Sequence, residues 1–156
     1  MIMKQYILIG ALFFSNACFA MSKLYDTDAA ALMKDGKPCF YISTPIEKET
    51  PDFLAGEGVH AAVFKVNGPS KWDMWVEKRL RVDPVAPKSC IPYGMKSPVR
   101  NDKLAVPLNH GEGYYFSLTG EYGRYRVYFC VKKDSGSNKD YLVKADKYGR
   151  CLSEPL

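Results

Sequence analysis

The segment Arg124-Tyr-Arg-Val-Tyr-Phe-Cys-Val-Lys132 decides the fold class of this chain. Its residues are aromatic, β-branched or long and cationic, which is typical of a strand and not of a helix. Because strand side chains alternate between two faces, one face is an unbroken apolar row: Tyr125, Val127, Phe129 and Val131. The opposite face carries Cys130 among arginines, a tyrosine and a lysine. Both faces need cover, so we expect this strand at the centre of a sheet.

The first twenty residues have the order of a bacterial secretory signal peptide. Lys4 carries the only charge, residues 6–14 are apolar or glycine, and small residues follow up to Ala20. The apolar run is too short for a membrane span, which takes about 20 residues. Cleavage after Ala20 would release a soluble chain, whereas cleavage before Cys18 would leave a lipid anchor on that cysteine. Both routes predict a periplasmic protein, with residues 1–20 as the signal peptide and residues 21–156 as a single domain.

Four cysteines remain in the mature chain on either route: Cys39, Cys90, Cys130 and Cys151. An even number of cysteines in an exported chain predicts two disulfides, and all three pairings are open. None of the spacings is C-x-x-C, which argues against a zinc site or a redox motif. We expect no metal and no cofactor.

Short β-rich segments alternate with prolines and glycines along the mature chain, the pattern of an all-β sandwich. Asp35-Gly36 between two apolar segments predicts a β-hairpin. Residues 44–58 are expected to form a long loop, and residues 83–99 an irregular edge pinned by Cys90. A tail that carries Cys151 follows the last strand. The further strands are expected at residues 59–66, 72–82, 104–106, 113–119, 124–132 and 141–145.

No catalytic motif stands out. His60 lies within an apolar strand and His110 in a turn, and neither belongs to a metal-binding spacing. The sequence has no G-x-S-x-G motif, and its cysteines are assigned to bridges. Three glycine-flanked glutamates keep a glycan or cell-wall hydrolase as an alternative: Glu57, Glu112 and Glu121. We expect a binding protein and not an enzyme.

Charge and aromatic residues narrow the class of partner. Without the signal peptide and its Lys4, 21 Lys and Arg against 17 Asp and Glu leave a charge of +4, too mild and scattered to predict nucleic-acid binding. Tyr, Trp and Arg anchor protein interfaces, whereas Trp72 is expected in the core. The strongest exposed candidate is Tyr122 at a hairpin tip. The other candidate partner-binding residues are Glu121, Arg124, Phe53, Glu57 and Glu112, of which Glu57 and Glu112 would enter a basic or catalytic cleft of the partner.

The strand that carries Tyr128-x-Cys130 follows a glycine-bearing loop, and it resembles the strand of immunoglobulin-type sandwiches that holds the second core cysteine. The resemblance implies an immunoglobulin-like antiparallel β-sandwich in which Cys39 pairs with Cys130 and Cys90 with Cys151. If Cys130 faces the core, the apolar row of the same strand faces outward, where another element covers it or a partner binds it.

Most of the mature chain resembles the type VI secretion immunity periplasmic lipoproteins of Gram-negative bacteria. The resemblance is carried by the export signal and by the segments Lys37–Ile42, Cys90 with Tyr93-Gly94, Gly113–Leu118, Tyr128–Val131 and Cys151. It implies a small β-rich periplasmic domain that binds and neutralises a toxin delivered by neighbouring cells. We expect this chain to act by blocking the toxin's active site or its access to substrate. Ser15 and Asn16 depart from a lipobox, which bears on the anchor at Cys18. The alternative binding function is a periplasmic accessory or adhesion module with an immunoglobulin-like fold.

Overall fold

The computed structural model describes residues 25–42, 59–76, 84–120 and 123–156. These ranges hold one short 3-10 turn, η1 (Pro87–Ser89), and ten strands, so the chain is all-β as predicted. The strands are β1 (Tyr25–Lys34), β2 (Lys37–Ile42), β3 (Val59–Lys65), β4 (Ser70–Val76), β5 (Ile91–Pro92), β6 (Arg100–Lys103), β7 (Gly113–Thr119), β8 (Gly123–Lys133), β9 (Asp140–Ala145) and β10 (Cys151–Pro155). In the described ranges, no helix has the length and apolar content to cross a membrane.

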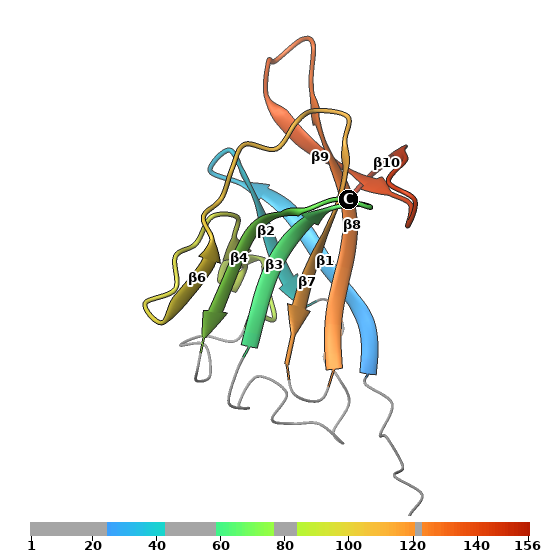
Figure 1. Ribbon diagram of the computed structural model, residues 1–156. Helices are drawn as coiled ribbons and strands as arrows, with labels where there is room; N and C mark the ends of the chain where they lie inside the picture. The colour runs from blue at the N-terminus through green and yellow to red at the C-terminus, as the bar shows by residue number, and fades with distance from the viewer. Residues whose placement is uncertain (1–24, 43–58, 77–83, 121–122) are drawn as a thin grey trace, which may run out of the picture.

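The ten strands form one curled sheet of mixed direction (Figure 1). Its main order is β5-β2-β1-β8-β7-β3-β4-β6, while β9 pairs with β8 and β10 pairs with β9. Every pair is antiparallel except β1 and β8, which run parallel between residues 25–28 and 123–126. This pair departs from the purely antiparallel sheet that the sequence predicted. Parallel neighbours need a long connection, so no short-range turn signal could announce them.

The curl originates at β8, the central strand predicted from residues 124–132. One edge of β8 pairs with β7, and the other edge is shared between β1 at its start and β9 at its end. Beyond Asp28, β1 leaves β8 and continues as the partner of β2. β1, β2 and β5 therefore turn over one face of the remaining strands and enclose the core.

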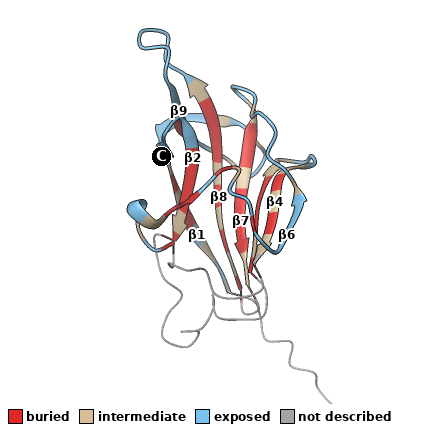
Figure 2. Ribbon diagram, turned by 90° about the vertical axis from the view of Figure 1, so that its left-hand side faces the viewer, coloured by how far each residue is buried: buried red, intermediate tan, exposed pale blue. Residues whose placement is uncertain are grey.

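The core joins these two layers. Phe40 of β2 stacks on Phe116 of β7 with ring centroids 4.2 Å apart. Buried and less buried residues alternate along the first half of β8, whereas β7 is buried along most of its length (Figure 2), and the apolar row of β8 is at most 7% exposed. The inward direction predicted for Tyr114, Phe116 and Leu118, and the core position predicted for Trp72, are confirmed.

The predicted hairpin at Asp35-Gly36 is confirmed. Lys34 and Lys37 are register partners across the turn, and both central residues have positive φ, 50° for Asp35 and 73° for Gly36. Two successive positive φ values belong to a type I′ turn, whose twist matches that of the flanking strands. Glycine and aspartate tolerate this region at low cost, so the local sequence fixes the register of β1 and β2.

Both predicted disulfides form, but the pairing implied by the immunoglobulin resemblance is wrong. Cys39 is bonded to Cys90, and Cys130 is bonded to Cys151. Cys130 follows the core residue Phe129, and Cys39 precedes the core residue Phe40. Alternation along a strand turns both cysteines away from the core, so they cannot meet across it. The apolar row of β8 consequently faces inward.

Two further predictions need correction near the ends of the sheet. The strand predicted at residues 104–106 is absent among the described residues there, and β6 lies just before it. The backbone of β6 pairs with β4, and Asp102 accepts hydrogen bonds from Trp75 Nε1 at 2.8 Å and from Arg100 Nη2 at 2.9 Å. The hydrogen bonds of polar residues 100–103 therefore decide where this strand forms, and the apolar residues 104–106 do not. The predicted tail contains β10, where Cys151 is the register partner of Ala145.

The remaining strand predictions agree with the structure where it describes them. Strands at 59–66, 113–119 and 141–145 are confirmed as β3, β7 and β9. The strand at 72–82 is confirmed as β4 up to Val76, and its continuation lies outside the described residues, as does the loop at 44–58. Apart from η1 and the two-residue strand β5, the described part of 83–99 is irregular, and it is fixed to β2 through Cys90.

Candidate functional site

The outer face of β3, β7 and β8 carries a row of aromatic rings around one arginine. Phe64 stacks on Tyr115 with ring centroids 5.1 Å apart, and Tyr115 lies 5.6 Å from Tyr128. The guanidinium of Arg126 lies 5.6 Å from the Tyr115 ring centre and 6.0 Å from that of Tyr128. These residues alternate along their strands with core residues, so the packing that buries one face fixes the other. Tyrosine and arginine are also the residue types that dominate protein interfaces.

A recess of about 480 Å³ opens beside this row, and we call it the basic pocket. It is lined by Lys65, Val66, Asn67, Gly68, Tyr115, Arg126, Tyr128 and Lys147. Three of these residues are cations, and none of the described residues in the lining is acidic. Arg126 Nη1 donates a hydrogen bond to Tyr128 Oη at 3.1 Å, which holds the guanidinium in place.

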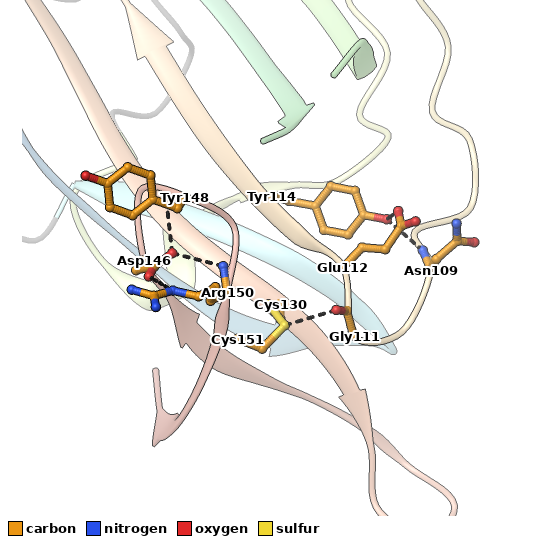
Figure 3. Close-up of a disulfide and its surroundings, with 9 residues drawn as sticks. All are labelled: Asn109, Gly111, Glu112, Tyr114, Cys130, Asp146, Tyr148, Arg150 and Cys151. Atoms are coloured by element: carbon orange, nitrogen blue, oxygen red, sulfur yellow. Dashed lines mark hydrogen bonds and ion pairs between the residues drawn. A yellow bond between two sulfur atoms is a disulfide. The ribbon is translucent and has the colours of Figure 1, made fainter. Parts of the chain in front are cut away.

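The turn between β9 and β10, Asp146–Arg150, forms the wall of this region and is called the Tyr148 turn. Figure 3 shows how Asp146 organises it: Asp146 Oδ1 accepts hydrogen bonds from the backbone N–H groups of Tyr148 and Arg150, each at 2.9 Å. Asp146 Oδ2 accepts a third from Arg150 Nε at 2.6 Å. These bonds hold the pKa of the Asp146 carboxyl below its usual value. Tyr148 is 65% exposed, and the cationic groups of Lys147 and Arg150 lie 5.1 and 5.9 Å from its ring centre.

Two features fasten the Tyr148 turn to the sheet. The disulfide from Cys151, the residue that follows the turn, reaches Cys130 on β8, and Cys151 Sγ lies 3.3 Å from the carbonyl oxygen of Gly111 (Figure 3). Gly149 lies directly against Gly113, where a Cβ at position 113 would stand 2.3 Å from the Gly149 carbonyl oxygen. Only glycine at position 113 allows this approach, so the exposed Tyr148 sits on a fixed support.

Glu112, one of the predicted contact residues, lies next to the basic pocket and is fully engaged within the chain. Its carboxylate accepts a hydrogen bond from Lys65 Nζ at 2.7 Å and another from Tyr114 Oη at 2.8 Å. The Lys65 and Tyr114 bonds lower the pKa of Glu112 to about 2. Burial, with the Glu112 bond second, raises the pKa of Tyr114 to about 12. A carboxyl this acidic cannot hold a proton near neutral pH, so it is unsuited to the role of general acid in a hydrolase.

Arg124, the other predicted contact residue in the described ranges, lies on the outer face of β8 two residues before Arg126. Its Nη2 lies 2.9 Å from Asp26 Oδ2, and this bond lowers the pKa of the Asp26 carboxyl. The ion pair links β1 to β8 beside their parallel register. The other sequence-predicted positions lie outside the described residues: Cys18, Phe53, Glu57, Glu121 and Tyr122.

Both histidines pair with a carboxylate. His60 Nε2 contacts Asp73 Oδ1 across β3 and β4, and its ring lies 4.5 Å from that of Trp75. His110 Nε2 lies 2.9 Å from Asp140 Oδ1. Within the described ranges, no group of three or more His, Cys, Asp or Glu residues is placed to hold a metal ion. The strand predicted around His60 and the turn predicted around His110 agree with the structure.

A second recess, of about 580 Å³, lies at the end of the core under residues 104–108. Tyr93 Oη donates to the carbonyl oxygens of Val106 at 2.6 Å or Lys71 at 3.1 Å, and Trp72 Nε1 donates to Met95 O at 2.9 Å. Burial raises the pKa of Tyr93 to about 12. These bonds fasten the irregular segment over the open edge of the core, and we assign this recess a packing role.

The sequence reasoning missed the basic pocket and the Tyr148 turn. Tyr148 stands in Asp146-Lys-Tyr-Gly149, where an aspartate and a glycine are the ordinary residues of a tight turn. That local signal could have placed Tyr148 at an exposed tip. Arg126, Tyr115 and Tyr128 follow from strand alternation alone, but their meeting with Lys147 depends on the return of β9 and β10 to β8.

Neither a protein-family model, nor a curated protein, nor a solved structure matches the chain. The class of protein is therefore argued from the fold and the site. The two disulfides indicate an oxidising, exported environment. An all-β chain with two disulfides and an exposed, rigidly held aromatic and basic surface is what the fold and the site define.

Proposed function

We propose that this chain is a periplasmic immunity protein that binds a type VI secretion toxin and occludes its active site. The observation that carries the proposal is the Tyr148 turn, which displays an exposed tyrosine between two cations on a support of three hydrogen bonds and a disulfide. A loop that is already ordered loses little conformational entropy on binding, which is how rigid inhibitors gain affinity. The resemblance to the immunity lipoproteins supplies the class of partner.

The basic pocket extends this surface across β3, β7 and β8. Exposed tyrosine and arginine side chains bury much area at a low entropy cost, and a well-ordered cluster of them fits a binding hot spot. The periplasmic location is part of the proposal, because the disulfides require only an oxidising compartment. An immunoglobulin-like accessory module would use the same surface for adhesion, and protection from a toxin separates the two functions.

The test uses the product of the gene next to the one that encodes this chain. That product is directed to the periplasm of a test strain with and without this protein, and survival and complex formation by size-exclusion chromatography are measured. We expect protection and a stable complex. Neither protection nor a complex would overturn the immunity function.

A matched pair of tyrosine variants assigns the surface. Tyr148→Ala removes the exposed ring of the turn, and Tyr41→Ala removes a tyrosine beside Phe40 on β2, which strand alternation places on the far side of the core. Loss of a central aromatic contact is expected to weaken the complex by about 2 kcal/mol or more for Tyr148→Ala, and Tyr41→Ala should leave affinity unchanged. Equal affinities for both variants would refute the role of the Tyr148 turn.

A further inference from the structure

We infer that the basic pocket receives an acidic side chain of the protein partner, an aspartate or a glutamate, between Arg126 and Lys147. The inference rests on the proposed function and adds the chemistry of the partner's contact. Its starting point is the lining of the pocket, in which the described residues contribute three cations and no carboxylate.

The three cations differ in how far they are already engaged. Lys65 is tied to Glu112 at 2.7 Å, and the low pKa of Glu112 keeps this pair ionised. Arg126 lies over two tyrosine rings and donates Nη1 to a hydroxyl, while its Nε is covered and has no hydrogen-bond acceptor among the described residues. Lys147 Nζ lies over the ring of Tyr148. Arg126 and Lys147 thus supply the positive charge that an incoming anion would meet.

The guanidinium is held ready for a planar anion. Arginine offers a flat fork of N–H donors that matches the two oxygens of a carboxylate, and stacking on aromatic rings fixes that plane in advance. Asp28 is the register partner of Arg126 on β1. The Arg124 bond lowers the pKa of Asp26, and the charge of Arg126 contributes to this lowering. A partner carboxylate would therefore approach the guanidinium from the side away from these β1 acids. Lys147 belongs to the opposite wall, where the Asp146 hydrogen bonds and the Gly149 contact hold it.

The size and position of the pocket favour a side chain of a bound protein over a free ion. A volume of about 480 Å³ exceeds the needs of a single small anion. The pocket also adjoins the exposed Tyr148, so a protein that covers Tyr148 brings its own side chains over the opening. Complementary charge would then fix the register of the complex and speed association.

The experiment measures the dissociation constant of the complex with the toxin for Arg126→Gln, Arg126→Lys and Lys147→Gln. The control is Lys88→Gln, a change at an exposed lysine of η1, close to the other disulfide. Loss of one partner of a covered charge pair weakens binding by about 30-fold or more, so we expect that loss for Arg126→Gln and a smaller loss for Lys147→Gln. Arg126→Lys keeps the charge but not the fork, and it should recover only part of the affinity.

A double-mutant cycle identifies the partner group. Toxin acids at the interface are changed one at a time to the amide, and each change is combined with Arg126→Gln; one of them should be coupled to Arg126. Sodium sulfate, added at constant ionic strength, should compete weakly. Strong competition by sulfate without coupling to any toxin acid would overturn the inference in favour of a free inorganic anion.

Two outcomes separate the failure of this inference from that of the proposed function. If the complex forms but the Arg126 and Lys147 variants bind as tightly as Lys88→Gln, the pocket assignment is wrong and the immunity function stands. If wild-type protein forms no complex, both fall. Circular dichroism shows whether the Arg126→Gln variant folds. If it does not fold, Lys147→Gln still tests the pocket, because Lys147 is exposed in the turn and its replacement should not disturb the fold.

Discussion

A methyl group added at position 113 should displace the Tyr148 turn and destabilise the protein. In Gly113→Ala the new Cβ would stand 2.3 Å from the carbonyl oxygen of Gly149 and 2.4 Å from its Cα. Real Cβ contacts essentially never fall below 3.0 Å, so the two backbones must separate by at least about 0.7 Å. The obstacle is backbone and not the end of a flexible side chain, so no rotamer change can relieve it.

The bridge between Cys130 and Cys151 limits that separation, because Cys151 follows Gly149 by two residues. Overpacking typically costs about 1–3 kcal/mol, and the restraint places Gly113→Ala in the upper half of that range. Urea unfolding of the oxidised protein, followed by tryptophan fluorescence, to which the buried Trp72 contributes, measures the change. Gly136→Ala is the matched control, because its Cβ would meet only Asp134 Oδ2, at 3.7 Å, and it should stay within about 0.5 kcal/mol of wild type.

A second measurement isolates the mechanism. With the bridge removed by alanine at positions 130 and 151, the turn can lift from the sheet, and the cost of Gly113→Ala should fall. A Gly113→Ala protein as stable as the Gly136→Ala control would refute the close packing of the two glycines. An equal cost with and without the bridge would refute the restraint.

Three other changes test the core, the second bridge and the acid stability. Phe40→Ala removes a fully buried ring stacked in the core and should cost about 3–5 kcal/mol in urea unfolding; a cost below 1 kcal/mol would contradict the two-layer packing. Replacement of Cys39 and Cys90 by alanine removes a bridge with a sequence separation of 51 and should cost about 4 kcal/mol of stability. Loss of the Cys130–Cys151 bridge, with a separation of 21, should cost about 3 kcal/mol. Calorimetry of both variants checks that the first is the less stable. The pKa of Glu112 is lowered from 4.5 to about 2 by its bonds to Lys65 and Tyr114, so its contribution to stability is present above pH 4.5 and is lost as the pH falls towards 2. Glu112→Gln should flatten the pH dependence of unfolding in that window, and an unchanged acid limb would count against the pairing.

Strand positions could be predicted because each depends on a few neighbouring residues. The alternation in 124–132 gave a central strand, and Asp35-Gly36 gave a hairpin whose φ values follow from its residue types. The same alternation also indicated which way Cys130 points, and so argued against a disulfide between Cys39 and Cys130 across the core. Cys130 is one residue from Phe129, so an inward apolar row requires an outward cysteine. The immunoglobulin resemblance led to the opposite pairing because it placed Cys130 in the core.

The pairing of strands that are distant in the sequence could not be predicted. The parallel contact of β1 with β8 and the return of β10 to β9 join segments whose sequences carry no sign of each other. β6 was missed because its four residues are polar, and side-chain bonds to Trp75 and Arg100 decide its place. The basic pocket shares this origin: Arg126 was visible on a strand face, but the position of Lys147 depends on the assembled sheet.

The two faces of β8 explain how the proposed binding surface is held rigidly. Phe129 on the inner face is fully buried, and its position is fixed by the packed core. The outer face of the same strand supplies Arg126 to the basic pocket and Cys130 to the bridge that holds the Tyr148 turn. Because one strand positions the pocket, the bridge and the core, movement of the surface relative to the core would require β8 to deform. Deformation of β8 would also disturb the hydrophobic core, so the core that stabilises the fold also holds the proposed binding surface in place.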